Sequence, residues 1–336
     1  MGRYLSRLNA ILSAEAKAVK SAKHSMTVIE NSPEEGLVSI VVAFLNAERF
    51  IAETIESVIG QTYGSWELIL VDDGSSDGGA AIVRSYEDIY PGRIRCLDHP
   101  GHKNLGMCTS RNLAVRHSRG EFIAVLDSDD VWLPQKLTEQ VDCMKRYPDA
   151  ALVYGRSEYW YDWTGNPSDT GKNFIDTLAP GDRLYPAPEL LLLCNLGHLG
   201  QPPPSDFLLR REALVQVGGF EEAFDPDHQM YEDQALLTKI YLQFPVYVSS
   251  QCWDRYRIHE KSLGAVSDAQ GRSEATRRFY VRWLAKYLHD HGVEEPRIWK
   301  AYWSCARYDR FPWLGRVAGA VRPFVHLVRK RDKGSI

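Results

Sequence analysis

The sequence predicts an α/β fold in which helices flank a mostly parallel sheet, followed by a helical C-terminal extension. Two observations support this prediction. Between residues 37 and 147, continuous apolar runs rich in Val and Ile alternate with segments whose apolar residues have helical spacing. Such runs are typical of strands buried on both faces, and strand–helix alternation gives parallel strands with right-handed crossovers. The 336 residues, 44% hydrophobic and 25% charged, have an ordinary globular composition.

The first half of the chain carries the regular part of this pattern. After residues 1–36, which are expected to form a helix and a loop, "LVSIVVAF" begins the first strand at Leu37. The next segment, "ERFIAETIESVIGQ", places its apolar residues on one helical face. Continued along the chain, the pattern predicts strands at 37–44, 66–73, 93–99 and 121–127, and helices at 48–61, 78–90, 107–120 and 133–147.

The second half is less regular. A long polar loop is expected over 163–188, and the small, polar residues 260–271 have the composition of a lid that orders over a substrate. Between these loops the pattern predicts a Leu-rich helix, a short strand, and a helix that ends at "VGGF". The remaining elements are a strand that runs into an aromatic loop within 151–163, a strand at 246–259 and a helix at 231–244.

These elements divide the chain into three segments. Residues 1–36 form an N-terminal helical extension, 37–265 the central domain, and 266–336 a basic, aromatic helical extension. Within the central domain, 37–133 and 134–265 are expected to form two halves. Strand ends in an open parallel sheet meet at one edge, so ligand-binding residues are expected where the strands of the first half end.

The charge distribution excludes some classes of partner. The net charge is −4, but residues 271–336 carry 15 Lys and Arg against 6 Asp and Glu, which leaves −13 on the remainder. So acidic a body is a poor nucleic-acid binder. The six cysteines contain no CxxC pair, and neither a signal sequence nor a membrane span is recognisable, so a reduced, cytoplasmic protein is expected. The basic extension either caps the core or docks on the anionic inner face of a membrane.

The segment "AVLDSDD" places three carboxylates directly after a predicted buried strand. Because side chains alternate along an extended chain, Asp127 and Asp129 lie on the same side. Two such carboxylates suit a hard divalent cation, Mg²⁺ or Mn²⁺, which often bridges protein and phosphate groups. The alternative is that Asp129 or Asp130 caps the helix that follows.

Two further acidic pairs have both structural and functional interpretations. In "LVDDGSSD", Asp77 could simply cap a helix, but Asp72 and Asp73 at a strand end could accept a hydrogen bond from a nucleotide base. In "MYEDQALL", Glu232 and Asp233 could favour the helix dipole, or one of them could reach a cleft as a general base.

Together these stretches resemble the family 2 glycosyltransferases of the GT-A fold, from Val38 to His259. The resemblance rests on "VSIVVAFLNAERFIAETIESVIGQTYGSWELILVDDGSSD", "NLGMCTSRNLAVRHSRGEFIAVLDSDDVWLP" and "GGFEEAF…YEDQAL", in that order. It implies a Rossmann-like nucleotide-diphospho-sugar transferase fold. It also implies an inverting enzyme that moves a sugar, most often from UDP, to a saccharide or lipid-linked acceptor in polysaccharide or glycoconjugate synthesis.

The resemblance also assigns roles to individual residues. Asp73 would bind the base, and Arg111 would lie near the diphosphate. Asp129 would ligate the metal directly, and Asp127 directly or through water, with Ser128 between them also at the donor. The other implied positions are the nucleotide site at Ala43, Asn46 and Glu48, the general base Asp233 with Glu232 in support, and a metal or diphosphate contact at His259.

Three alternatives remain at this point. A nucleotidyltransferase would show a Gly-rich basic loop after the first strand, and a dinucleotide-binding oxidoreductase would show GxGxxG there; "VAFLNAERF" contains neither. A catalytically silent protein of the same fold would be expected to lack Asp129 or Asp233, and both are present. The sequence departs from the family at Ala43 and Leu45, which replace a hydroxyl residue and an aromatic residue. His259 also has a simpler interpretation as a surface residue.

Overall fold

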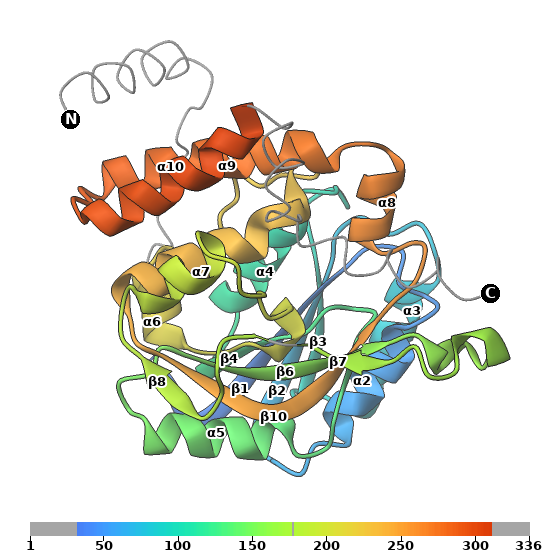
Figure 1. Ribbon diagram of the computed structural model, residues 1–336. Helices are drawn as coiled ribbons and strands as arrows, with labels where there is room; N and C mark the ends of the chain where they lie inside the picture. Colours follow the sequence, from blue (N-terminus) through green and yellow to red (C-terminus); the bar gives the residue numbers. More distant parts are fainter. Residues whose placement is uncertain (1–31, 177, 311–336) are drawn as a thin grey trace.

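A computed structural model describes residues 32–176 and 178–310, which form one mixed sheet covered by helices on both faces (Figure 1). The strand order is β3-β2-β1-β4-β9-β6-β10-β5, with β7 beside β6 and β8 beside β10. The helix predicted within 1–36 lies outside the described residues, apart from the last few positions. Those positions belong to the first strand, because β1 begins at Glu34 rather than Leu37.

The first half of the chain has the predicted strand–helix alternation. Strands β3, β2, β1 and β4 pair in parallel, which confirms the predicted parallel half of the sheet. The elements are β1 (Glu34–Phe44), α2 (Ile51–Ile59), β2 (Trp66–Asp72), α3 (Gly79–Ile89), β3 (Ile94–Asp98), α4 (Met107–Arg116) and β4 (Gly120–Val125).

Continuous apolar runs produce these buried strands. Every residue of β2 is buried, as are residues 38–42 of β1, so each face of the sheet needs a cover. Helix α2 supplies part of it, because Ile51, Ile55 and Val58 lie on its buried side. The apolar residues therefore form two clusters, one on each face of the sheet.

The second half adds shorter elements around the same sheet. Strand β9 runs antiparallel between β4 and β6, and the long β10 pairs in parallel with β6. The strands are β5 (Val131–Trp132), β6 (Leu152–Trp160), β7 (Phe174–Ile175), β8 (Arg183–Tyr185), β9 (Leu208–Arg210) and β10 (Val246–Arg257). The α-helices are α5 (Lys136–Arg146), α6 (Arg211–Gln216), α7 (Glu232–Gln243), α8 (Leu263–Ala269), α9 (Ser273–Asp290) and α10 (Pro296–Arg310).

Three predictions about this half need correction. The Leu-rich segment forms the short π-helix η3 (Leu191–Asn195) rather than a longer regular helix. The loop predicted over 163–188 contains β7, β8 and two short 3₁₀ turns, η1 (Asp162–Thr164) and η2 (Pro167–Asp169). The loop predicted over 260–271 contains helix α8, whose first turn is capped by the side chain of Ser262.

The C-terminal helices pack against the core. Figure 1 shows α9 and α10 beside α7, on one face of the sheet. Tyr280 of α9 stacks on Tyr231 at a ring distance of 5.4 Å, and Phe279 packs edge-on against Phe224 at 5.2 Å. Tyr231 belongs to the 3₁₀ turn η5 (Gln229–Tyr231), which leads into α7. The described part of the extension is therefore a helical cap. Within residues 32–176 and 178–310, no helix combines the length and apolarity that crossing a bilayer requires.

Candidate active site

The predicted site residues gather at the edge where β1, β2 and β4 end. Asn46 and Glu48 follow β1, Asp73 follows β2, and Asp127 and Asp129 follow β4. These strands are neighbours in the sheet and run in the same direction, so their carboxyl ends meet. The structure thus brings the predicted donor-side residues to one place.

The acidic residues at this edge have an internal counter-charge, Arg111 of α4. Its side chain is 2% exposed, and its Nη2 donates a 2.5 Å hydrogen bond to Asp127 while its Nη1 donates to Glu232 at 3.2 Å. Burial alone would lower the pKa of Arg111, but the two carboxylates raise it above its ordinary value. One guanidinium therefore connects the predicted metal-binding loop to the predicted base.

Asp130 has a structural role that differs from helix capping. It is fully buried, and its carboxyl accepts hydrogen bonds from the hydroxyl of Ser205 at 2.5 Å and the backbone N–H of Arg257 at 2.9 Å. Burial and the neighbouring carboxylates raise its pKa well above the usual range. Strand β5 separates the acidic loop from α5, which has no side-chain cap, so the capping alternative for Asp129 and Asp130 is wrong.

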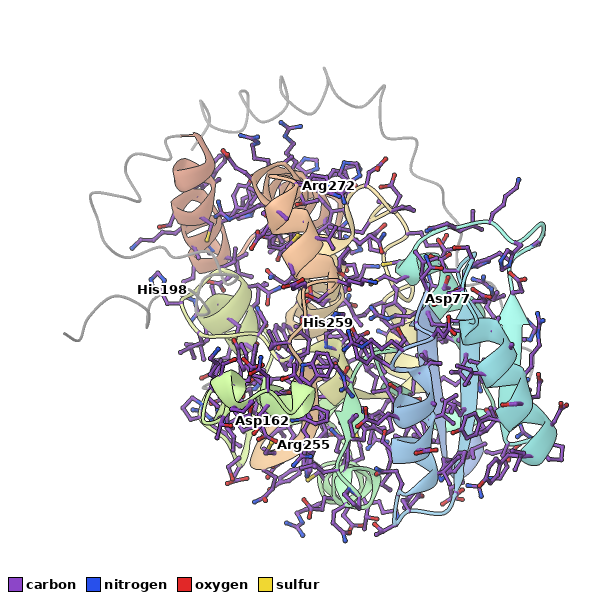
Figure 2. All side chains as sticks on the ribbon, turned by 90° about the vertical axis from the view of Figure 1, so that its right-hand side faces the viewer. Asp77, Asp162, His198, Arg255, His259 and Arg272 are labelled. Atoms are coloured by element: carbon purple, nitrogen blue, oxygen red, sulfur yellow. The ribbon has the colours of Figure 1, made fainter. Side chains whose placement is uncertain are left out.

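Asp129 and His259 form the pair that best fits a cation. The Nε2 of His259 lies 2.8 Å from the Oδ2 of Asp129, and the ring of His259 packs against Phe50 at 4.9 Å. In Figure 2, His259 lies between the labelled Asp77 of the first half and the labelled Asp162 of the second. At this distance the two atoms share a hydrogen bond, and a carboxylate oxygen and an imidazole nitrogen are ligand types that Mn²⁺ accepts. Among the described residues no group of three His, Cys, Asp or Glu side chains could hold a metal ion, so the remaining ligands would come from a substrate or water.

Asp73, which was predicted to bind the nucleotide base, is buried. Its side chain accepts hydrogen bonds from the backbone N–H groups of Leu105 at 2.8 Å and Gly106 at 3.0 Å. Burial raises its pKa, against the lowering effect of these bonds. Ala43, at the end of β1, offers a nucleotide no side-chain hydrogen bond. Any contact with Ala43 must use its backbone.

Asn46 and Glu48 join the loop after β1 to the loop after β2. The backbone N–H of Asn46 donates to the Ser75 hydroxyl at 3.0 Å, and its side-chain oxygen accepts from the Ser76 N–H at 2.8 Å. The N–H of Glu48 donates to Asp77 at 2.9 Å, while the other oxygen of Asp77 accepts from the first N–H of α3. The N-cap of α3 is Gly78 and has no side-chain cap, so Asp77 does not occupy the predicted capping position; it holds the turn before α3 through these bonds, which connect the two loops of the candidate nucleotide site.

Glu232 and Asp233 occupy the first turn of α7, as predicted. Burial, with the neighbouring carboxylate second, raises the pKa of Glu232 to about 8. Burial also raises the pKa of Asp233 to about 6, although its bond from the Gln234 N–H lowers it. Glu232 is buried and paired with Arg111, whereas Asp233 is half-buried. At neutral pH a carboxyl with a pKa of about 8 is mostly protonated and one with a pKa of about 6 is mostly ionised, so of the two Asp233 is the side chain that could accept a proton.

Two residues that support the acidic loop were not predicted. Ser205 lies in the 3₁₀ turn η4 (Pro204–Asp206), and its hydroxyl also accepts from the N–H of Asp127 at 3.1 Å. The Nε of Arg257 donates to the backbone oxygen of Asp129 at 2.7 Å. Arg257 precedes His259 by two positions, and this strand-like spacing could have indicated a shared face. Ser205 carries no comparable signal in the sequence.

Residues 39–217 match the family described as Glycosyl transferase family 2, which is more than half of the 336-residue chain. The chain is 37% identical over 166 residues to UDP-Glc:alpha-D-GlcNAc-diphosphoundecaprenol beta-1,3-glucosyltransferase WfgD of Escherichia coli, covering 49% of this chain and 59% of that protein. It is 35% identical over 148 residues to putative teichuronic acid biosynthesis glycosyltransferase TuaG of Bacillus subtilis, covering 44% and 57%. The chain thus spans less than two thirds of the length of each relative.

A solved structure is similar over nearly the whole chain. The mannosyltransferase PcManGT from Pyrobaculum calidifontis, in complex with GDP-Man and Mn²⁺, has a TM-score of 0.55 at 17% identity, covering 96% of this chain and 87% of that chain. At this level of identity the likeness concerns the fold. It confirms the fold class that the sequence predicts.

Proposed function

Because the chain belongs to glycosyl transferase family 2, we propose that it transfers a sugar from a nucleotide-diphospho-sugar to an acceptor hydroxyl. The observation that carries this proposal is the position of Arg111, which bonds to Asp127 on the donor side and to Glu232 beside the base. A sugar transferase requires its donor and its proton acceptor to meet at one point. This guanidinium joins the residues that would serve both.

The proposed donor is a UDP-sugar. The curated relative from Escherichia coli is named for UDP-Glc, which supports this choice of nucleotide. The base and ribose would lie where β1 and β2 end, against Ala43, Asn46, Glu48 and Asp73, with Ser128 and Arg111 nearer the diphosphate. Leu45, which is 42% exposed at the end of β1, would offer an apolar surface to the base in place of an aromatic ring.

A divalent cation, Mn²⁺ or Mg²⁺, is part of this proposal. Asp129 and His259 would hold it, with Asp127 as a direct or water-mediated partner. A cation bound there would act as a Lewis acid and stabilise negative charge on a leaving diphosphate. The complex of PcManGT with Mn²⁺ supports the choice of metal through the shared fold alone.

The proposed step is a single displacement. Asp233 accepts the proton of the acceptor hydroxyl as that oxygen forms a bond to the anomeric carbon. The bond from the anomeric carbon to the phosphate oxygen breaks at the same time, and its electron pair leaves with the nucleoside diphosphate. Attack from the face opposite the leaving group inverts the anomeric centre. Arg111 holds Glu232 beside the base and keeps the charges of the cluster balanced.

The proposed acceptor is a saccharide, in the first instance one linked to a lipid through a diphosphate. The names of the two curated relatives support this class, because one specifies a diphosphoundecaprenol acceptor and the other teichuronic acid biosynthesis. Synthesis of a cell-surface polysaccharide or glycoconjugate would follow from such an acceptor.

The test is a screen for transfer and donor hydrolysis over a panel of sugar nucleotides, with and without Mn²⁺. We expect release of the nucleoside diphosphate from one UDP-sugar only when the metal is present. Asp233→Asn should still bind that donor but lose transfer, and Asp129→Ala should lose metal-dependent donor binding. Parent-level transfer by Asp233→Asn would refute the assignment of the base. Donor binding with no turnover on any acceptor would favour the alternative of a catalytically silent sugar-nucleotide-binding protein.

A further inference from the structure

An arginine on two aromatic rings lies beside the Asp129–His259 pair. The guanidinium carbon of Arg49 lies 4.8 Å from the ring centre of Trp163 and 5.1 Å from that of Phe50. Phe50 in turn packs against His259, whose Nε2 is 2.8 Å from Asp129. Arg49 follows β1 and Trp163 belongs to η1, so the two halves of the domain meet at this point.

The neighbouring arginines already have carboxylate partners. Arg257 is buried and its Nη2 donates to Glu53 at 2.6 Å, while Arg255 donates to Glu158 at 2.9 Å. Arg49 differs, because within residues 32–176 and 178–310 it forms no ion pair and its contacts are the two rings. It is exposed, so its hydrogen-bond donors remain available for a ligand.

Stacking prepares this guanidinium for an anion. The rings restrict its side chain without occupying its N–H groups, which lowers the entropy lost when a ligand binds. A planar guanidinium matches two oxygens of a phosphate group. We propose that Arg49 binds a diphosphate group in the catalytic cleft, a role that rests on the proposed sugar transfer. The diphosphate belongs either to the donor nucleotide or to the lipid-linked acceptor.

Steady-state kinetics with matched acceptors distinguish the two sources. One acceptor carries its sugar on an alkyl diphosphate, and the other carries the same sugar as a neutral alkyl glycoside. Losing a charge-assisted hydrogen bond costs roughly tenfold or more in affinity, so Arg49→Ala should raise one KM by at least about tenfold. If only the KM of the diphosphate acceptor increases, the diphosphate group that Arg49 binds belongs to the acceptor. An increase in the KM of the sugar nucleotide with both acceptors identifies the donor.

The matched control is Arg93→Ala. Arg93 also lies on an indole, 3.7 Å from the ring centre of Trp66, but at the start of β3 and therefore at the opposite edge of the sheet. The Arg93→Ala variant should leave the KM values of donor and acceptor within about twofold of the parent, as expected for an exposed site away from the cleft. The proposal is overturned if Arg49→Ala behaves like Arg93→Ala, or if it raises only the KM of the neutral glycoside.

A binding measurement separates this proposal from the proposed activity. Titration calorimetry of the full chain with inorganic pyrophosphate and Mn²⁺ needs no turnover. Arg49→Ala should weaken pyrophosphate binding by about tenfold or more, whereas Arg49→Lys should weaken it less because one charge remains. If the parent transfers no sugar yet shows this loss, the proposed reaction fails and the anion site stands. Equal pyrophosphate affinities of parent and Arg49→Ala would remove the anion site.

Discussion

Arg111 shows at the scale of one residue how a buried cluster of like charges can be tolerated. Its two terminal nitrogens each bond to a different carboxylate, one on the loop after β4 and one on α7. The charge of a buried carboxylate is costly unless it is paired, and neither Asp127 nor Glu232 has another cation as partner among the described ion pairs. The cluster therefore depends on this single side chain.

The first prediction concerns the removal of this charge. Arg111→Met leaves Asp127 and Glu232 without their cation, so above pH 8, where both carboxyls are ionised, the free energy of unfolding should fall by about 3–5 kcal/mol. Arg116→Met, at the exposed end of the same helix, is the control and should change stability by less than about 0.5 kcal/mol. Urea denaturation of both variants measures the difference. Equal midpoints would mean that Arg111 contributes no net pairing energy.

The second prediction follows from the pKa of Asp233, which burial raises to about 6. A general base must be deprotonated, so the proton bound below this pKa removes activity. We expect kcat/KM to fall about tenfold for each pH unit well below 6 and to level off above it. Asp233→Asn should lack this acidic limb in any residual activity. A parent profile that stays flat from pH 5 to pH 7 would contradict the assignment.

At the scale of an element, the turn η4 supports the acidic loop from behind. The Nζ of Lys136 on α5 lies 2.9 Å from Asp206, and both side chains are fully buried. The backbone N–H of Gly155 also donates to Asp206, and the neighbouring Ser205 bonds to the loop that carries Asp127. A buried ion pair thus anchors the turn on which the predicted metal-binding loop rests.

The third prediction tests this anchor. Lys136→Met leaves Asp206 buried without a cation, and unfolding free energy should fall by about 3–5 kcal/mol. Lys145→Met, on the exposed side of the same helix, should change it by less than about 0.5 kcal/mol. Thermal or urea denaturation measures both. A Lys136→Met variant as stable as Lys145→Met would show that the pair merely replaces an equally favourable apolar contact.

The same scale shows what the sequence could predict. Parallel strands of the first half were predicted to within a few residues, because each is a continuous apolar run that must be buried on both faces. The π-helix η3 and helix α8 were not, since their form depends on tertiary contacts. In η3, Asn195 donates to Thr238 and to the Tyr280 hydroxyl, residues far away in the chain.

The site was predictable to the same degree and for the same reason. Acids that follow buried strands had to meet at one edge, and Asp127 and Asp129 do so beside Arg111 and His259. Their supports come from distant segments: Ser205 lies in an irregular turn, which no periodicity marks. The sequence could indicate which side chains carry charge, but not that Asp130 is buried and structural.

At the scale of the whole molecule, the C-terminal extension divides into two parts. Helix α9 covers the turn that leads to the base, through the stacking of Tyr280 on Tyr231. Beyond the described residues, 311–336 carry six Lys and Arg against one Asp. The helical cap belongs to the folded body, and we propose that membrane docking uses the basic residues of 311–336.

The fourth prediction separates these two parts. The full chain should float with anionic vesicles in a density gradient and a chain ending at residue 310 should not, since each basic residue near such a surface contributes about 1 kcal/mol. Neither chain should float with neutral vesicles. Circular dichroism should show both folded, whereas a chain ending at residue 270 should lose stability with α9. Equal flotation of the first two chains would remove the docking proposal.

The two hydrogen bonds by which Arg111 joins Asp127 and Glu232 have one more consequence. In the protein without ligands, the guanidinium of Arg111 is already paired with Asp127, so this carboxylate is not free to bind a cation. If a cation binds at Asp127 as proposed, the guanidinium of Arg111 would have to share or release that carboxylate while it keeps its bond to Glu232. Binding of a cation at Asp127 would then change the electrostatic potential at Glu232 and Asp233, because the side chain of Arg111 contacts both Asp127 and Glu232.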